Sequence, residues 1–206
     1  MIGTGYVGLV SGTCFADLGN IVHCVDKDLK KINLLKSCKS PIYEPGLDEL
    51  IKKNYNAKRL LFTNDLQSAV KNSDIIFICV GTPNKKRSQD VDLSYVFSAV
   101  KEIIKNIKNK KILVTKSTVP LGTGDQIENL LKKNKKRNIE VISNPEFLRE
   151  GEAVRDFRYP DRIVIGSNNR KIFKIMKKLY QPLINKGAKF FTTSRRGAEL
   201  IKYASN

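Results

Sequence analysis

A glycine-rich turn at residues 3–8 places the strongest constraint on the fold of this chain. The turn reads GTGYVG, and its glycines are Gly3, Gly5 and Gly8. In a strand–turn–helix unit such glycines permit a tight turn, let the backbone approach a pyrophosphate and let the helix pack closely. Apolar residues at helical spacing follow the turn, but only Met1 and Ile2 precede it. We therefore expect a dinucleotide-binding turn whose leading strand, the first of the sheet, is missing.

Short β-branched runs alternate with segments of helical period along the rest of the chain. Such runs indicate buried parallel strands, and they cover residues 21–26, 60–63, 74–81, 111–118, 139–143, 162–166 and 188–193. Helical spacing covers residues 28–35, 47–55, 93–107, 126–131 and 172–179. This alternation predicts an α/β fold, a Rossmann-like doubly wound parallel sheet with helices on both faces and the strand order 3-2-1-4-5-6.

One domain accounts for most of this pattern. No repeat or low-complexity linker interrupts the alternation, so we expect a single dinucleotide-binding domain over residues 1–193, incomplete at its N-terminus. A new helical pattern begins at Arg195 and reaches residue 206 without a glycine cap or a proline. We interpret residues 194–206 as the start of a connecting helix.

The composition argues against several classes of protein. Hydrophobic residues make up 41% and charged residues 28% of the chain, which suits a globular domain rather than a disordered segment. No run of apolar residues is long enough to span a membrane, so we expect a soluble, cytoplasmic protein without membrane association. The net charge of +18 comes from lysines spread over separate segments. We therefore expect an anionic small ligand rather than a nucleic acid as the partner.

The cysteines and the single histidine give no sign of a metal site or a nucleophile. None of the four cysteines has metal-ligand spacing, and three lie in apolar runs, which predicts buried, reduced thiols. His23 lies in the middle of a predicted strand, several residues before its carboxyl end. A packed or surface histidine is therefore favoured there over a general base.

An acidic residue at the end of the next strand supports the interpretation of the glycine turn. Asp26 ends the run IVHCVD, about 20 residues after the turn, where a carboxylate accepts hydrogen bonds from the adenosine ribose. A carboxylate at this position repels a 2′-phosphate, so the sequence favours NAD over NADP.

Three further segments follow predicted strands at their carboxyl ends. They are CVGTP (residues 79–83), TKSTVPLGT (115–123) and SNPEFLREG (143–151). Each alone is compatible with a capped turn. Because ligands bind at the carboxyl ends of strands in open α/β sheets, we expect the three segments to line one cleft.

These motifs together resemble the UDP-glucose 6-dehydrogenase family. The resemblance rests on GTGYVGLVSG, PIYEPGL, KSTVPLGT, SNPEFLREG, PDRIVIG and AELIKYASN, which occur in order along essentially the whole chain. GDP-mannose dehydrogenases share several of the motifs, and UDP-N-acetylmannosamine dehydrogenases fit less well. The segment PDRIVIG favours UDP-glucose, although a specificity of the GDP-mannose type stays open.

The resemblance implies oxidation of a sugar C6 alcohol through an aldehyde to a carboxylate, with two hydride transfers to NAD. The substrate would be UDP-glucose and the product UDP-glucuronate, and full-length relatives are homo-oligomers. The implied cofactor-binding residues are Gly3, Thr4, Gly5, Tyr6, Val7, Gly8, Asp26, Lys31, Val80, Gly81, Thr82, Pro83, Ser117, Thr118, Val119 and Glu150. The implied substrate-binding residues are Glu146, Phe147, Leu148, Arg149, Glu150, Lys202 and Asn206.

Four of these residues have catalytic roles in the family that the chain resembles. Glu146 corresponds to the acid/base residue, and Thr118 approaches the reacting alcohol through an ordered water. Lys202 and Asn206 contact the reacting sugar, where a cation and an amide donor suit developing negative charge on oxygen.

Two departures from the family pattern limit what the chain is expected to do. The family nucleophile is a cysteine in a G-x-C-F-P-K-D pattern, and none of the four cysteines lies in such a context. The C-terminal UDP-binding domain also has no counterpart in these 206 residues. We therefore expect the chain as given to be an inactive portion of a dehydrogenase. The alternative is a non-catalytic remnant or an NAD-binding module.

Overall fold

The computed structural model describes residues 1–85, 90–136 and 138–205. Its helices are α1 (Tyr6–Asp17), α2 (Leu29–Lys36), α3 (Leu47–Asn56), α4 (Leu66–Lys71), α5 (Ser94–Asn106), α6 (Thr123–Lys133), α7 (Ala153–Arg158), α8 (Arg170–Ile184) and α9 (Arg195–Ser205). Its strands are β1 (Val22–Val25), β2 (Leu60–Thr63), β3 (Ile75–Ile78), β4 (Lys111–Thr115), β5 (Ile139–Ser143), β6 (Arg162–Gly166) and β7 (Lys189–Thr193).

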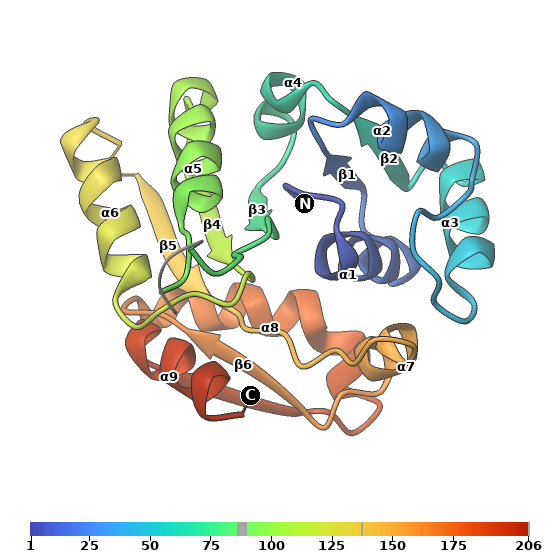
Figure 1. Ribbon diagram of the computed structural model, residues 1–206. Helices are drawn as coiled ribbons and strands as arrows, with labels where there is room; N and C mark the ends of the chain where they lie inside the picture. The colour runs from blue at the N-terminus through green and yellow to red at the C-terminus, as the bar shows by residue number, and fades with distance from the viewer. Residues whose placement is uncertain (86–89, 137, 206) are drawn as a thin grey trace.

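The strands form a mostly parallel sheet between two layers of helices (Figure 1). β1 pairs with β2, and β3 to β7 pair in chain order. All of these pairs are parallel except β5 with β6, which meet antiparallel at Ser143 and Gly166. The predicted α/β class and the Rossmann-like order of the first strands are confirmed, whereas the expectation of a wholly parallel sheet is wrong at this one pair.

The glycine turn has a two-residue remnant of the strand that we expected to be missing. No regular strand precedes α1 in the described chain, but Ile2 forms parallel bridges to Val25 and to Ile78. The Ile2 N–H donates to the Phe77 carbonyl at 2.8 Å, and the Ile2 carbonyl accepts from the Cys79 N–H at 2.8 Å. The expected gap between β1 and β3 is therefore closed at its carboxyl end by one residue.

Two helices escaped the sequence pattern, and one is longer than predicted. α4 and α7 have only six residues each, too few to establish a helical period. α8 runs over 15 residues and includes Pro182 near its end. A proline in the last turn still breaks the apparent period because it is read as a stop signal.

Apolar residues cover both faces of the sheet. One core cluster joins α1, α2, α3, α7 and α8 to the sheet, and a second joins α4, α5 and α6 to its other face. The four cysteines are free thiols, and Cys14, Cys24 and Cys79 are buried as predicted. His23 is half-buried in the middle of β1, where burial and the N-terminal charge lower its pKa. No helix in the described ranges is long and apolar enough to cross a membrane.

Candidate functional site

The glycine turn meets the strand end of β3 at backbone contact distance. Gly3 has a φ of +95°, and a Cβ there would lie 2.8 Å from the Cys79 carbonyl oxygen. A Cβ at Gly8 would collide with the carbonyl oxygen of Gly3. Gly5 differs from both, because nothing lies within 4 Å of its Cβ position. The turn is thus packed on its inner side and open at Gly5, which fits the close approach of a pyrophosphate to the N-terminus of α1.

Asp26 is held rigidly beside the turn. Its Oδ2 accepts hydrogen bonds from the Thr4 N–H at 2.9 Å and from the Thr4 hydroxyl at 2.7 Å. Lys31 Nζ lies 3.4 Å from the same oxygen. Burial alone would raise the pKa of Asp26, but the hydrogen bonds from Thr4 and Asp28 and the charge of Lys31 outweigh it and lower the pKa. Oδ1 accepts only the Asp28 N–H, so an ionised oxygen remains available to a ribose hydroxyl.

The loops after β3 and β4 are joined to each other. The Ser117 hydroxyl donates to the Val80 carbonyl at 2.7 Å, and its N–H donates to the Ile78 carbonyl at 3.1 Å. Val119 is buried beneath this loop, whereas Gly81 and Pro83 are exposed. The structure therefore brings together the cofactor residues predicted around the turn, those of the β3 loop (Val80, Gly81, Thr82, Pro83) and those of the β4 loop (Ser117, Thr118, Val119).

Tyr6 differs from the other residues of the turn because of its side chain. Its hydroxyl is buried and has no hydrogen-bond partner in the described chain. Burial and the nearby carboxylates, Glu44 first among them, raise its pKa. The phenol is therefore neutral at ordinary pH.

Glu146 and Lys202 form an ion pair at the opposite end of the predicted cleft. Lys202 Nζ lies 3.0 Å from Glu146 Oε1, and each side chain is only 10% exposed. The other oxygen, Oε2, accepts the Leu148 N–H at 2.6 Å. The ring of Phe147 lies beside the pair, with its centroid 5.6 Å from Lys202 Nζ. A carboxylate and an ammonium are thus fixed against each other with little water around them.

The remaining residues of the predicted substrate loop point in different directions. Arg149 is tied back by a two-point contact to Asp156, at 3.1 Å from Nε and 2.7 Å from Nη2, and by a contact of 2.6 Å to Glu152. Glu150 is exposed and makes no side-chain hydrogen bond or ion pair with the described residues. Asn206, the last predicted site residue, lies outside the described residues.

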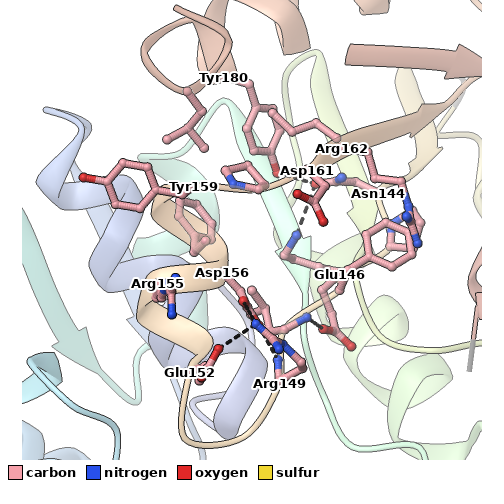
Figure 2. A pocket seen from close by; sticks show the side chains of 18 residues that line it. Asn144, Glu146, Arg149, Glu152, Arg155, Asp156, Tyr159, Asp161, Arg162 and Tyr180 are labelled. Atoms are coloured by element: carbon pink, nitrogen blue, oxygen red, sulfur yellow. Dashed lines mark hydrogen bonds and ion pairs between the residues drawn. The ribbon is translucent and has the colours of Figure 1, made fainter. Parts of the chain in front are cut away.

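A half-open cavity of about 700 Å³ lies beside the Glu146 loop. Figure 2 shows its labelled polar side chains, which come from the Glu146 loop, from α7, from the start of β6 and from α8. Lys116, Asn144 and Tyr180 are its buried polar members. The glycine turn and Asp26 do not line it, so the cavity and the cofactor groove lie on different sides of Glu146.

Two buried glutamates hold the loops of the site, and the sequence analysis missed both. Glu44, 6% exposed, accepts the N–H groups of Gly151 at 2.6 Å and Ala153 at 3.0 Å. It therefore fixes the end of the Glu146 loop at the start of α7. The motif PIYEPGL contains this residue, but nothing local in the sequence indicates that its carboxylate is buried.

Glu199, 3% exposed, does the same for the loop after β4. It accepts the N–H groups of Gly122 at 2.7 Å and Gly124 at 2.8 Å, at the start of α6. Arg195, one helical turn earlier on α9, pairs with Asp125 and Glu128. The only available signal was the spacing of Arg195, Glu199 and Lys202, which places all three on one face of a helix.

None of the described cysteines is placed as a nucleophile. Burial raises the pKa of Cys79 to about 12, that of Cys14 to about 12 and that of Cys24 to about 11. Thiols with such pKa values remain protonated at neutral pH and are poor nucleophiles. This agrees with the sequence, in which no cysteine lies in the expected context.

Comparisons with known proteins agree with this geometry. Residues 1–184 match the UDP-glucose/GDP-mannose dehydrogenase family, NAD binding domain. Over its whole length the chain is 52% identical to a UDP-glucose 6-dehydrogenase of Rhizobium meliloti and 50% identical to one of Bacillus subtilis, of which it covers 48% and 44%. The chain therefore spans about half the length of these curated relatives.

Solved structures give the same result. A GDP-mannose dehydrogenase from Pseudomonas aeruginosa, solved as a ternary complex, superimposes with a TM-score of 0.94 at 37% identity, over 100% of this chain and 48% of that one. A UDP-glucose dehydrogenase from Pyrobaculum islandicum superimposes with a TM-score of 0.93 at 36% identity, over 99% of this chain and 48% of that one.

Proposed function

The chain belongs to the UDP-glucose/GDP-mannose dehydrogenase family, whose NAD-binding domain it matches, and from this premise we propose that it oxidises a nucleotide sugar, with UDP-glucose as the substrate. NAD is the cofactor, and the open turn at Gly5 together with the fixed carboxylate of Asp26 fits it. When bound, NAD accepts a hydride from the sugar alcohol. The single observation that carries the proposal is the buried Glu146–Lys202 pair at 3.0 Å, beside the cofactor groove.

In the proposed site each residue has one task. The N-terminus of α1 and the N–H groups of the turn bind the pyrophosphate, and Asp26 binds the adenosine ribose. The Glu146 carboxylate takes the alcohol proton through a water that Thr118 positions. The Lys202 ammonium stabilises negative charge that develops on the sugar oxygen. Each of these roles needs a preorganised group, and Glu44 and Glu199 supply rigidity by fixing the neighbouring loops.

The second oxidation needs a thiolate, which we infer that these 206 residues do not supply. The high pKa values of the buried cysteines support this inference. The same observation favours the second candidate, a module that binds NAD without turnover. We propose residues 1–193 as the NAD-binding unit and residues 194–206 as the start of a connecting helix. A cytoplasmic location, a homo-oligomeric full-length enzyme and the absence of a nucleic-acid partner complete the proposal.

Cofactor binding is tested by calorimetry with NAD and NADP on the parent and on Asp26→Ala. We expect the parent to prefer NAD, and we expect Asp26→Ala to weaken NAD binding about tenfold or more because the ribose loses a charge-assisted hydrogen bond. Glu102→Ala is the control, since it removes an exposed carboxylate that contacts only Lys27. Equal NAD affinity in the parent and in Asp26→Ala would reject the role of Asp26.

Catalysis is tested by the appearance of NADH at 340 nm with UDP-glucose or GDP-mannose as the substrate. We expect no sustained turnover from these 206 residues alone. A steady signal of two NADH per sugar that Glu146→Gln abolishes would contradict that expectation. NAD binding without any turnover, even after a C-terminal half from a relative is supplied in trans, would favour the module instead.

A further inference from the structure

Lys116 is a buried cation without a matching anion. It directly follows β4 and is 4% exposed. Its ammonium carries three N–H donors, but in the described chain only one acceptor lies within hydrogen-bond range, the Asn144 Oδ1 at 3.4 Å. A buried charge of this kind is costly unless it is paired and fully hydrogen-bonded. The protein alone therefore leaves Lys116 under-satisfied.

Asn144 cannot compensate the charge of Lys116, because it serves other partners. Its Oδ1 also accepts the hydroxyl of Tyr180, and its Nδ2 donates to the Val164 carbonyl at 3.0 Å. One neutral oxygen is thus shared between an ammonium and a phenol. This network fixes the positions of Lys116 and Asn144 but adds no negative charge.

All three members of the network line the 700 Å³ cavity beside the Glu146 loop. Figure 2 places Asn144 and Tyr180 at its inner end, away from Glu152 and Arg155. The ammonium of Lys116 is therefore within reach of a small ligand that enters the cavity. The cavity is roomy enough for water as well as for a group of several heavy atoms.

The uncompensated charge around the cavity is positive. Arg149 is neutralised by Glu152 and Asp156, which also line the cavity. Glu146 is neutralised by Lys202. The cations without an ion pair among the described lining residues are Lys116, Arg155 and Arg162, against the single carboxylate of Asp161. The cavity therefore attracts an anion rather than a cation.

We propose that the inner end of this cavity is a subsite for an oxyanion, a carboxylate or phosphoryl group, bound by the ammonium of Lys116. The Asn144 side chain orients the ammonium. The subsite does not depend on the proposed dehydrogenase activity, because it lies on the other side of Glu146 from the cofactor groove. Burial lowers the pKa of Lys116, and a bound anion would raise it again because it stabilises the charged form.

The test measures binding of inorganic phosphate and of acetate to the protein, by calorimetry and by thermal unfolding, at constant ionic strength set with chloride. Phosphate and acetate distinguish a phosphoryl from a carboxylate preference. We expect saturable binding of at least one of them to the parent, and binding about tenfold weaker or more in Lys116→Met because a charge-assisted hydrogen bond is lost.

Lys111→Met is the matched control. Lys111 lies at the start of the same strand and is also buried, but its Nζ donates to the carbonyls of Ser73 at 2.5 Å and Lys71 at 3.2 Å. Lys111 does not line the cavity. We expect Lys111→Met to lose stability and keep the anion binding. Equal binding in the parent and in Lys116→Met would assign the anion to surface lysines and overturn the proposal, as would the absence of binding beyond that of chloride.

A second measurement keeps the test decisive if Lys116→Met does not fold. The affinity of the parent for acetate should fall as the pH rises towards the lowered pKa of Lys116, because the neutral amine no longer attracts the anion. The titratable groups that face this amine are Cys79 on β3, Glu146 on the loop after β5 and Lys202 on α9. The variant Lys116→Gln keeps a donor without the charge and should bind acetate weakly at every pH. A pH-independent affinity in the parent would contradict the subsite.

Discussion

Helices α1 and α9 both dock on the sheet, but they do so by opposite means. α1 buries small and apolar residues, including Gly8, Gly12 and Phe15, and the ring of Phe15 lies 5.3 Å from that of Phe77. α9 buries charges: Arg195 at 3% exposure and Glu199 at 3% both contact the start of α6. Apolar contacts fix how closely α1 approaches the sheet, whereas hydrogen-bonded charges fix which residue of α9 meets which partner.

The difference is reflected in the site. α1 supplies the backbone of the cofactor turn, for which close approach is the main requirement. α9 supplies Lys202, which must meet one carboxylate, Glu146, at 3.0 Å. A shift of one residue along α9 would break the contacts of Arg195, Glu199 and Lys202 together. The register of a catalytic pair is thus set by buried charges, and the space for a ligand by glycines.

The largest expected effect comes from removing the charged anchor of α9. Arg195→Met should cost about 3 kcal/mol of unfolding free energy, the lower end for a broken buried ion pair, because the two carboxylates left behind are about a third exposed. Denaturant unfolding measures it. Arg196→Met is the control, since Arg196 contacts Asp125 from the surface and should cost no more than about 0.5 kcal/mol. Equal costs for the two variants would break the comparison.

A smaller effect is expected from overpacking α1. A Cβ at Gly12 would lie 2.6 Å from Cys24 Sγ and 3.0 Å from Met1 Cγ, so Gly12→Ala should cost about 1–3 kcal/mol. Gly5→Ala is the matched variant, because the Cβ position of Gly5 is open and its φ is −68°. We expect Gly5→Ala to keep its stability and to lose NAD affinity, as the methyl group stands where the pyrophosphate approaches. A stable Gly12→Ala would mean that α1 slides freely.

Acid should loosen α9 before it loosens the middle of α1. Hydrogen bonds from Arg195 lower the pKa of Asp125, and those from Lys132 and Arg195 lower the pKa of Glu128. Because both folded-state pKa values are depressed, the stability from these pairs is present above the ordinary values of about 4 and is lost as the pH falls through the folded values. Amide exchange at decreasing pH, expressed as protection factors, should show α9 opening first. Earlier loss of protection in residues 8–16 would refute it.

The smallest effect is expected at a surface pair. Lys132 lies 2.8 Å from Glu128 one turn away on α6, and its side chain is 60% exposed. Lys132→Ala should change the unfolding free energy by at most about 0.5 kcal/mol. Together with Arg195→Met, this variant separates the two partners of Glu128. A large cost for Lys132→Ala would place the anchor of α9 on the surface rather than in the interior.

The sequence predicted the strands and the cofactor turn well, because both depend on local patterns. β-branched runs located all seven described strands, and the spacing of the glycines located the start of α1. The helices α4 and α7 were missed because six residues do not establish a period. The antiparallel meeting of β5 and β6 at Ser143 and Gly166 depends on tertiary packing alone.

The site residues divide in the same way. Asp26 was predictable because a strand end fixes its position relative to the turn. The burial of Glu44 and Glu199 was not, since a glutamate is ordinarily exposed and only the fold brings the N–H groups of distant loops to its carboxylate. Lys116 was hidden for the same reason, because the sequence gives no indication that its ammonium lacks an anion.

The contacts of Glu199 also have a consequence for how the protein forms during synthesis. Its carboxylate binds the N–H groups of Gly122 and Gly124, which precede it by 77 and 75 residues. A ribosome adds about 5–20 residues per second, so the start of α6 waits roughly 4–15 s for its partner. During that interval the first turn of α6 has no carboxylate at its N–H groups. The loop that carries Ser117 and Thr118 therefore reaches its final form only when α9 has emerged, so the cofactor groove is completed from the far end of the chain.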